Sequence, residues 1–397
     1  MTGMRFVDGM PSLTPVAPAR DTHVYAPHMR VLHGEVTPLL PPIPGMSEAE
    51  RLRIAIVIPQ FQFGSGGHSV LFQVISRLER RGHVCSIWLE DPFGFHERPI
   101  ELVRDAVRAD YAGVEAPFFH GFHDWMGADV VMATGWQTAY PVMGLDGCRA
   151  RVYMVNDHEP EFYPTSIETH LAAATYRLGL PCLAGGGDWM ARTLTERYGA
   201  RVLDVVPYGI DEEYRPRPVE RRTDTVVLYA REITPRRAVA LGLMALEHVH
   251  RRRPGLRVVV FGDPTPPEAA FPYEHIGLAS PGQLAWLYSE ATVGVAFSMT
   301  NASLVPQDML ACGLPVVDVA GYGTEAVHGR DGAAELAPFD DVAVAAAIER
   351  LLDDPGLRAE RRRAGLEHAS RHTWDRTTDR VEAGLRTALR ERTCSGS

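Results

Sequence analysis

Two groups of charged side chains stand where they could do chemistry. Arg231 and Arg236 follow the apolar run 225–230 and precede a predicted helix. Asp157 and Glu159 follow another short apolar run, 151–155. Paired guanidinium groups bind phosphate oxygens, and carboxylates accept hydrogen bonds from hydroxyl groups. The arginines could neutralise a pyrophosphate, and the acids lie where open α/β sheets bind ligands. A pair of solvated surface arginines is the alternative for the first group.

The stretch 293–319 contains a third candidate site. It reads as an apolar strand, a polar loop, a helix with Pro306 in its first turn, and a second strand after Gly313. Such a βαβ unit places a strand-end loop beside a helix N-terminus, whose backbone N–H groups bind anions. Asp308, early in this helix, could accept a sugar hydroxyl, with Thr300 and Asn301 just before it. A helix-start acid that only complements the helix dipole explains Asp308 equally well.

Alternating strands and helices must position these groups. At 397 residues the chain is too long for one ordinary core. We therefore expect an α/β protein with two doubly wound domains that face each other across a cleft. The expected parts are an N-terminal extension (1–47), an N-terminal domain (48–207), a C-terminal domain (208–372) and a final helix with a tail (373–397). The strands are predicted at apolar runs, namely 53–58, 84–89, 128–133, 151–155, 202–206, 225–230, 256–261, 293–297 and 315–319.

Composition excludes several classes of function. The chain has no Lys, so its 40 basic residues are all Arg, and a net charge of −10 argues against nucleic acid as a partner. The 5 cysteines are scattered, which supports neither a disulfide framework nor a zinc site. A signal peptide is not apparent, and no apolar run approaches the ~18 residues that a bilayer span needs. We expect a cytoplasmic protein with at most peripheral membrane contact.

A glycine-rich turn follows the first apolar run. Gly66, Gly67 and His68 open a predicted amphipathic helix, and such a turn brings a backbone close to phosphate or sugar. The spacing is not G-x-G-x-x-G, so a dinucleotide site is not indicated. A tight turn that needs positive φ at either glycine is the alternative. His68 could contact a ligand, although an exposed histidine at a helix start explains it as well.

The run QDMLACGLPVV at 307–317 resembles the nucleotide-sugar signature of family 4 GT-B glycosyltransferases, also called glycosyltransferase group 1. In that family two acids separated by seven positions precede a small-residue-Gly-x-Pro strand entry. Asp308 matches the second acid, which binds the ribose of the donor. Thr300 stands where the first acid is expected, so the usual contact to the donor sugar departs from the pattern.

The resemblance extends along the chain. Arg231 and Arg236 match the family's basic residues that hold the donor diphosphate, and Gly66 and Gly67 match a glycine pair that lines the donor. The family implies a GT-B fold in which the final helix crosses back to the first domain. The remaining donor contacts that we expect from it are Gly277, Leu278, Thr300, Asn301, Ser303 and Leu304.

The phrase DHEPEFYP at 157–164 is similar to bacterial rhamnosyltransferases of the same family. By this resemblance Asp157 orients or activates the acceptor, and His158 and Glu159 lie on the acceptor side. A metal site in this phrase is less favoured, because adjacent residues seldom converge on one ion. A solvated acidic loop is the remaining alternative.

The function that the resemblance implies is hexosyl transfer. A sugar, for example the deoxyhexose L-rhamnose, would pass from a nucleotide diphosphate donor to a saccharide or natural-product acceptor. The family implies retention of anomeric configuration, no metal and no cofactor, in bacterial polysaccharide biosynthesis. Two alternatives stay open: a GT-B nucleotide-sugar epimerase, and a catalytically degenerate glycosyltransferase that acts as a partner subunit. Thr300 in place of an acid suggests the second.

Overall fold

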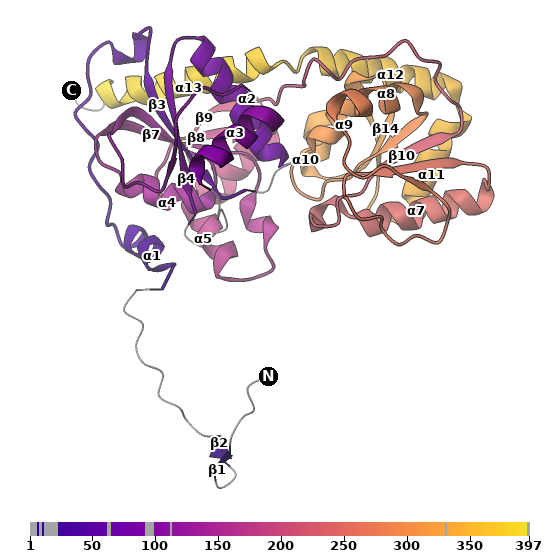
Figure 1. The fold of residues 1–397 in the computed structure, drawn as a ribbon, viewed down its shortest axis with the longest axis horizontal. Helices are drawn as coiled ribbons and strands as arrows, with labels where there is room; N and C mark the ends of the chain where they lie inside the picture. The colour runs from indigo at the N-terminus through magenta and orange to yellow at the C-terminus, as the bar shows by residue number, and fades with distance from the viewer. Residues whose placement is uncertain are drawn as a thin grey trace.

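The structure, a computed structural model, describes residues 6–7, 10–11, 23–61, 65–91, 99–111, 113–329 and 332–394. Figure 1 shows two lobes side by side, the first coloured indigo to magenta and the second pink to orange. Each lobe contains one parallel sheet with hydrophobic clusters on both of its faces. This confirms the predicted pair of doubly wound α/β domains.

The N-terminal sheet has 7 parallel strands in the order β5-β4-β3-β6-β7-β8-β9. Helices α2 (Gly66–Arg80) and α3 (Ile100–Asp110) cover one face, and α4 (Trp136–Gly144) and α6 (Asp188–Arg192) cover the other. Helix α5 (Ile167–Thr175) packs on α4. The strands are β3 (Arg53–Pro59), β4 (Val84–Glu90), β5 (Phe118–His120), β6 (Ala128–Ala133), β7 (Cys148–Val155), β8 (Cys182–Gly185) and β9 (Val202–Val206).

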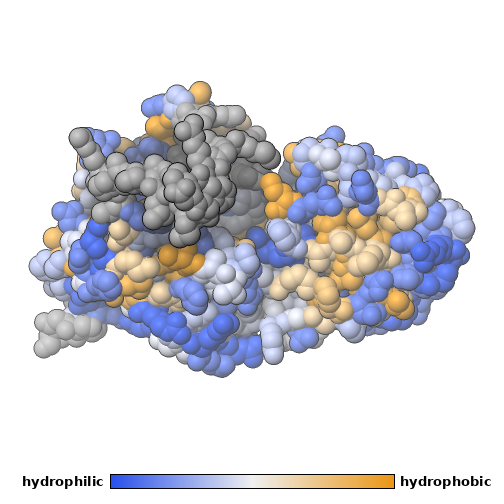
Figure 2. Space-filling view, turned by 90° about the horizontal axis from the view of Figure 1, so that it is seen from below, coloured by the Kyte–Doolittle hydropathy of each residue, from blue (hydrophilic) through white to orange (hydrophobic). Residues whose placement is uncertain are grey.

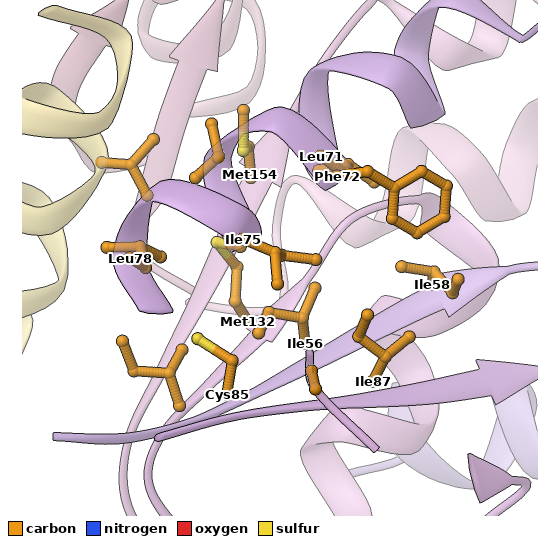
Figure 3. Packing of buried hydrophobic residues seen from close by; sticks show 14 of the residues in the cluster. Ile56, Ile58, Leu71, Phe72, Ile75, Leu78, Cys85, Ile87, Met132 and Met154 are labelled. Atoms are coloured by element: carbon orange, nitrogen blue, oxygen red, sulfur yellow. The ribbon is translucent and has the colours of Figure 1, made fainter. Parts of the chain in front are cut away.

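Strand β3 and helix α2 show why these residues fold as they do. Ile56 and Ile58 lie two positions apart, so both side chains point to the same face of the sheet. Leu71, Ile75 and Leu78 share one face of α2, because positions three and four apart are neighbours on a helix. Figure 3 shows these side chains packed against one another. Each such burial stabilises the fold by about 1.5–3 kcal/mol.

The C-terminal sheet has 6 parallel strands in the order β12-β11-β10-β13-β14-β15. Helices α7 (Val239–Arg252) and α11 (Asp341–Asp353) cover one face, and α8 (Pro281–Glu290) and α9 (Leu304–Ala311) cover the other. Helix α12 (Pro355–Ser370) packs on α9. The strands are β10 (Thr225–Tyr229), β11 (Arg257–Phe261), β12 (Glu274–His275), β13 (Val293–Val295), β14 (Val316–Val319) and β15 (Ala334–Ala337).

Both sheets reverse their strand order beside their first strand. The reversal falls between β3 and β6 in the N-terminal sheet and between β10 and β13 in the C-terminal sheet. Loops that leave two such strands part in opposite directions, and the crevice between them is where α/β sheets bind ligands. The crevice of the C-terminal domain lies between loops 230–238 and 296–303, which carry the predicted arginines and Thr300.

The described part of the predicted N-terminal extension lies along the N-terminal domain. Helix α1 (Ala26–Leu32) packs on α4. The backbone N–H groups of Thr37 and Leu40 donate to the carbonyls of Met143 (3.0 Å) and Cys148 (2.8 Å). Strands β1 (Phe6–Val7) and β2 (Met10–Pro11) pair with each other. Residues 1–5, 8–9 and 12–22 of the extension lie outside the described residues.

The chain crosses between the domains twice, and the two crossings lie side by side. The backbone N–H of Ile210 donates to the carbonyl of His372 at 3.1 Å. Trp374 Nε1 donates to Asp211 Oδ1 at 2.7 Å, and a Cβ on Gly209 would lie 2.7 Å from Trp374 Cα. Helix α13 (Trp374–Cys394) then runs back along the N-terminal domain, where it packs on α2 and β9 (Figure 1).

One face of the C-terminal domain carries an apolar patch with hydrophilic residues around it. Helix α7 lies along the lower side of this domain in Figure 1 and exposes Met244. Figure 2, seen from below, shows hydrophobic residues gathered over this lobe.

Within the described ranges, no helix combines the length and the apolar character that a membrane span requires.

Candidate functional site

The two domains meet at the carboxylate of Asp157. The loop after β7 places this side chain against residues of the C-terminal crevice. Asp157 Oδ2 accepts a hydrogen bond from Thr300 Oγ1 at 3.0 Å, and Oδ1 accepts one from the backbone N–H of Asn301 at 3.1 Å. Arg236 Nε lies 3.8 Å from Oδ2. Four residues predicted from the sequence thus converge, although 143 residues separate Asp157 from Thr300.

Asn301 is held by the N-terminal domain through its side-chain amide. Its Nδ2 donates to the carbonyl of Asn156 at 2.7 Å, and its Oδ1 accepts from Trp189 Nε1 at 3.2 Å. Gly186 packs on the same amide, and a Cβ there would overlap with it. Asn301 was predicted to contact the nucleotide-sugar donor. In this conformation both the Nδ2 and the Oδ1 of its side chain form hydrogen bonds with the N-terminal domain instead. Asn156, Trp189 and Gly186 were not predicted, because nothing in their local sequence points across the cleft.

The predicted arginines lie on the loop between β10 and α7. Arg231 comes just after the strand, and Arg236 lies in a 3-10 turn, η4 (Pro235–Arg237). The Arg236 guanidinium lies 4.2 Å from the ring centroid of Phe162, a cation–π contact with the N-terminal domain. Burial lowers the pKa of Arg236, and the nearby Asp157 carboxylate opposes this shift. Arg237, which the sequence did not single out, donates to Ser298 Oγ at 3.0 Å and so braces the Thr300 loop.

Helix α9 begins at the same crevice. Ser303 is its N-cap, with Oγ accepting from the backbone N–H of Val305 at 3.4 Å. Leu304 Cδ1 lies 3.4 Å from the point where a Cβ on Gly66 would lie. Two residues that were predicted to contact the nucleotide-sugar donor are therefore neighbours across the cleft. Gly66 and Gly67 are exposed at the start of α2. The next residue, His68, stacks on Phe61 with ring centroids 4.7 Å apart.

Asp308 lies deeper along α9 and is half-buried. Burial raises the pKa of its carboxyl well above the usual range, and the Asp211 carboxylate adds to this shift. A carboxyl that resists ionisation can donate a hydrogen bond as well as accept one. Asp308 is therefore suited to pair with a hydroxyl group of a ligand.

Gly277 and Leu278 lie at the carboxyl edge of the C-terminal sheet, just beyond β12. The carbonyl of Gly277 accepts from the backbone N–H of Gly262 at 2.9 Å. A φ of +64° explains why glycine stands at 277. Leu278 is 69% exposed. These two residues share the sheet edge that carries Arg231, with one strand between them.

His158 and Glu159 turn into the N-terminal domain. His158 Nε2 pairs with Tyr198 OH at 2.7 Å, and Glu159 Oε2 accepts from the backbone N–H of Trp136 (2.6 Å) and from Tyr153 OH (3.2 Å). Burial raises the pKa of Glu159 to about 8. Both side chains are at least nine-tenths buried, which favours support of the Asp157 loop over the acceptor contact predicted for them.

A metal site does not emerge from the part of the chain that the structure describes. No group of three or more His, Cys, Asp or Glu side chains there is arranged to hold an ion. The cysteines whose side chains are described are buried and unpaired, namely Cys85, Cys148, Cys182 and Cys312.

Comparisons with known proteins match both halves of the chain. The family model "WsaF, C-terminal domain" matches residues 224–349, which span the C-terminal sheet. The O-antigen biosynthesis protein RfbC of Myxococcus xanthus is 29% identical over 265 residues, which cover 65% of this chain and 20% of RfbC. The D-inositol 3-phosphate glycosyltransferase of Acidothermus cellulolyticus is 31% identical over 234 residues, which cover 51% of this chain and 52% of that protein. The chain therefore spans about half or less of the length of these relatives.

Solved structures match the two-domain architecture. Anabaena HepE in complex with UDP superposes with a TM-score of 0.64 and 14% identity, over 84% of this chain and 100% of HepE. The fold is GT-B. The cleft between the two GT-B domains is the place where Asp157 meets Thr300 and Asn301. The matched family model covers the whole C-terminal wall of this GT-B cleft, from Arg231 to Asp308.

Proposed function

We propose that this GT-B protein is a glycosyltransferase that moves a sugar from a nucleoside diphosphate donor to an acceptor hydroxyl. The observation that carries the proposal is the set of hydrogen-bond donors at the C-terminal crevice. The Thr300 hydroxyl, the Asn301 backbone N–H and the Arg236 guanidinium converge on one carboxylate, with Arg231 on the same loop. A set of hydrogen-bond donors with positive charge suits the phosphates of such a donor. The similarity to D-inositol 3-phosphate glycosyltransferases and to UDP-bound HepE supports this choice.

In the proposed reaction the bond between the sugar C1 and the diphosphate oxygen breaks, and a bond from C1 to the acceptor oxygen forms. The diphosphate leaves with the bonding electrons, and its departing oxygen takes the proton of the acceptor hydroxyl. Arg231 and Arg236 stabilise the charge that develops on this leaving group. Asp308 holds the ribose, and Asp157, once free of the C-terminal crevice, orients the acceptor. We expect retention of configuration without a metal or cofactor.

The finer identity of the substrates is also a proposal. A hexose such as the deoxyhexose L-rhamnose is our choice of donor sugar, from the likeness of residues 157–164 to rhamnosyltransferases. RfbC is named for O-antigen biosynthesis, which supports a saccharide acceptor and a role in polysaccharide biosynthesis. We place the reaction in the cytoplasm.

A panel of nucleotide sugars tests the proposal. The purified protein is incubated with UDP-, GDP-, ADP- and dTDP-sugars, with and without saccharide acceptors, and free nucleoside diphosphate and new sugar products are measured. We expect release of one nucleoside diphosphate that rises when an acceptor is present. A changed sugar nucleotide without an acceptor would instead indicate an epimerase. Complete inactivity on the panel would favour the partner-subunit hypothesis.

A further inference from the structure

The carboxylate of Asp157 lies among polar groups of the C-terminal domain that surround it as a cradle, namely Thr300, Asn301 and Arg236. Its two oxygens receive the Thr300 hydroxyl at 3.0 Å and the Asn301 backbone N–H at 3.1 Å, and Arg236 Nε lies 3.8 Å away. From its own loop the carboxylate receives the backbone N–H of His158 at 2.8 Å. A backbone N–H, a hydroxyl and a guanidinium are also the groups with which proteins bind phosphate.

We propose that Asp157 is an internal ligand of a phosphate cradle, and that a nucleoside diphosphate enters the cleft by displacing its carboxylate. This inference rests on the proposed function, because it assigns the donor's phosphate to this cradle. Two anions repel each other at such short range, so the cradle holds the carboxylate or a phosphate but not both.

The environment of Asp157 favours its displacement. Burial raises the pKa of Asp157, and the Arg236 charge only partly opposes this shift, so the ionised carboxylate is costly where it lies. A phosphate group offers three oxygens to the same hydrogen-bond donors, and Arg231 lies on the same loop as Arg236. A diphosphate can therefore make more charge-assisted hydrogen bonds here than the carboxylate makes.

Displacement is coupled to the contact between the domains. The bonds from Asn301 to Asn156 and from Trp189 to Asn301 cross the same interface as the bonds to Asp157. Release of the carboxylate removes two hydrogen bonds from this interface and so weakens it. The same event frees Asp157 for the acceptor. Because only molecules with a vacated cradle bind the donor, the internal carboxylate reduces the apparent affinity for nucleoside diphosphate.

Removal of the carboxylate should therefore tighten nucleotide binding. The affinities of wild type, Asp157→Asn and Asp157→Ala for UDP, GDP, ADP and dTDP are measured by isothermal titration calorimetry. We expect both variants to bind the preferred nucleoside diphosphate about tenfold more tightly, as removal of a competing closed state predicts. Glu161→Gln is the matched control, because Glu161 lies in the same loop but pairs with His158. It removes the same charge and should leave the affinity near that of the wild type.

Each outcome separates this inference from the proposed function. If wild type binds a nucleoside diphosphate and both Asp157 variants bind it equally or more weakly, the cradle proposal is wrong and the proposed function stands. If Glu161→Gln tightens binding as much as Asp157→Asn, a general charge effect replaces the cradle. If no protein binds any of the four nucleotides at millimolar concentration, both proposals are wrong. Thermal unfolding of each variant establishes that it is folded, and Asp157→Asn, which keeps the side-chain size, guards against misfolding of Asp157→Ala.

Discussion

The two crevices of this molecule have the same topology and opposite chemistry. Each lies where the strand order of a parallel sheet reverses, at the carboxyl ends of the strands. The N-terminal wall presents the exposed Gly66 and the acid Asp157, and the C-terminal wall presents Arg231 and Arg236. Topology thus determines where a ligand can bind, and the side chains at the strand ends determine which charge it carries.

The polar groups of the cleft differ in whether their hydrogen-bond partners lie in the same domain. In the N-terminal wall, the Glu159 carboxylate bonds inside its own domain, to Trp136 and Tyr153. In the C-terminal wall, the Thr300 hydroxyl and the Asn301 amide bond to the opposite domain. The hydrogen bonds of Glu159 are therefore independent of domain closure. Those of Thr300 and Asn301 depend on it, as do those that Asp157 accepts from them.

The largest effect should follow from loss of an arginine in the C-terminal wall. Arg231→Ala or Arg236→Ala should lower kcat about a hundredfold, because each removes a preorganised charge from the leaving diphosphate. Steady-state release of nucleoside diphosphate measures this. Arg251→Ala, on the exposed end of α7, removes an arginine whose ion pair among the described residues is with Glu247, and it should leave kcat unchanged. A normal rate for both cleft variants would disprove the diphosphate assignment.

The buried Glu159 of the N-terminal wall should make the free energy of unfolding depend on pH. The folded pKa of Glu159 is raised to about 8, so the folded state keeps a proton that the unfolded state loses near pH 4.5. Its contribution to stability is complete below pH 4.5 and is lost as the pH rises towards 8. Glu159→Gln should therefore gain stability relative to wild type by about 1.4 kcal/mol for each unit that the pH rises between 5 and 8. Urea unfolding of both proteins across this range measures the difference, and parallel pH curves would contradict the buried titration.

The contact between the walls can be broken at Gly186. Its φ of +78° disfavours any Cβ, and a Cβ there would also overlap with the Asn301 amide. Gly199 has a similar φ of +67° with nothing within 4 Å, so Gly199→Ala isolates the backbone cost. We expect Gly199→Ala to lower the free energy of unfolding by about 1 kcal/mol and Gly186→Ala by about 1–2 kcal/mol more. Equal losses in denaturant unfolding would show that the Asn301 contact adds nothing.

The smallest effect concerns backbone strain in the C-terminal wall. Ala238, between Arg237 and α7, has φ +44° and is the one non-glycine residue with positive φ among those described. Ala238→Gly should raise the free energy of unfolding by about 0.5 kcal/mol, since glycine adopts this conformation without strain. Ala240→Gly, inside α7, should lower it by about 0.5–1 kcal/mol. A loss of stability in both variants would show that position 238 is not strained.

Much of the fold follows from the sequence. The continuous apolar run at 53–58 became strand β3 because a strand buried on both faces needs apolar residues throughout. The helix ends were less predictable. The helix predicted after Arg236 begins only at Val239, because Ala238 takes a left-handed conformation that no local sequence signal indicates. Residues 188–197 divide into α6 and a π-helical turn, η3 (Thr193–Arg197), and the sequence contains no signal for this division.

The site was predictable only in part. Residue type and strand-end position were enough to select Asp157 as a candidate, and the family resemblance added Arg236 and Thr300. Their mutual contact was not, because a hydrogen bond between domains depends on the angle at which two separate sheets meet. The burial of His158 and Glu159 could not be predicted either. The sequence pattern of a polar residue after a strand is the same whether its side chain faces solvent or the interior.

The position of α13 has a consequence for the order in which the two domains fold during synthesis. Val381, Leu385 and Leu389 of this helix belong to the hydrophobic cluster that also contains Ile54 and Leu71. The N-terminal domain therefore lacks one wall of its core until α13 has been synthesised, whereas the cluster around β10 is complete within residues 226–357. We expect the C-terminal domain to fold before the N-terminal domain, whose core α13 then completes.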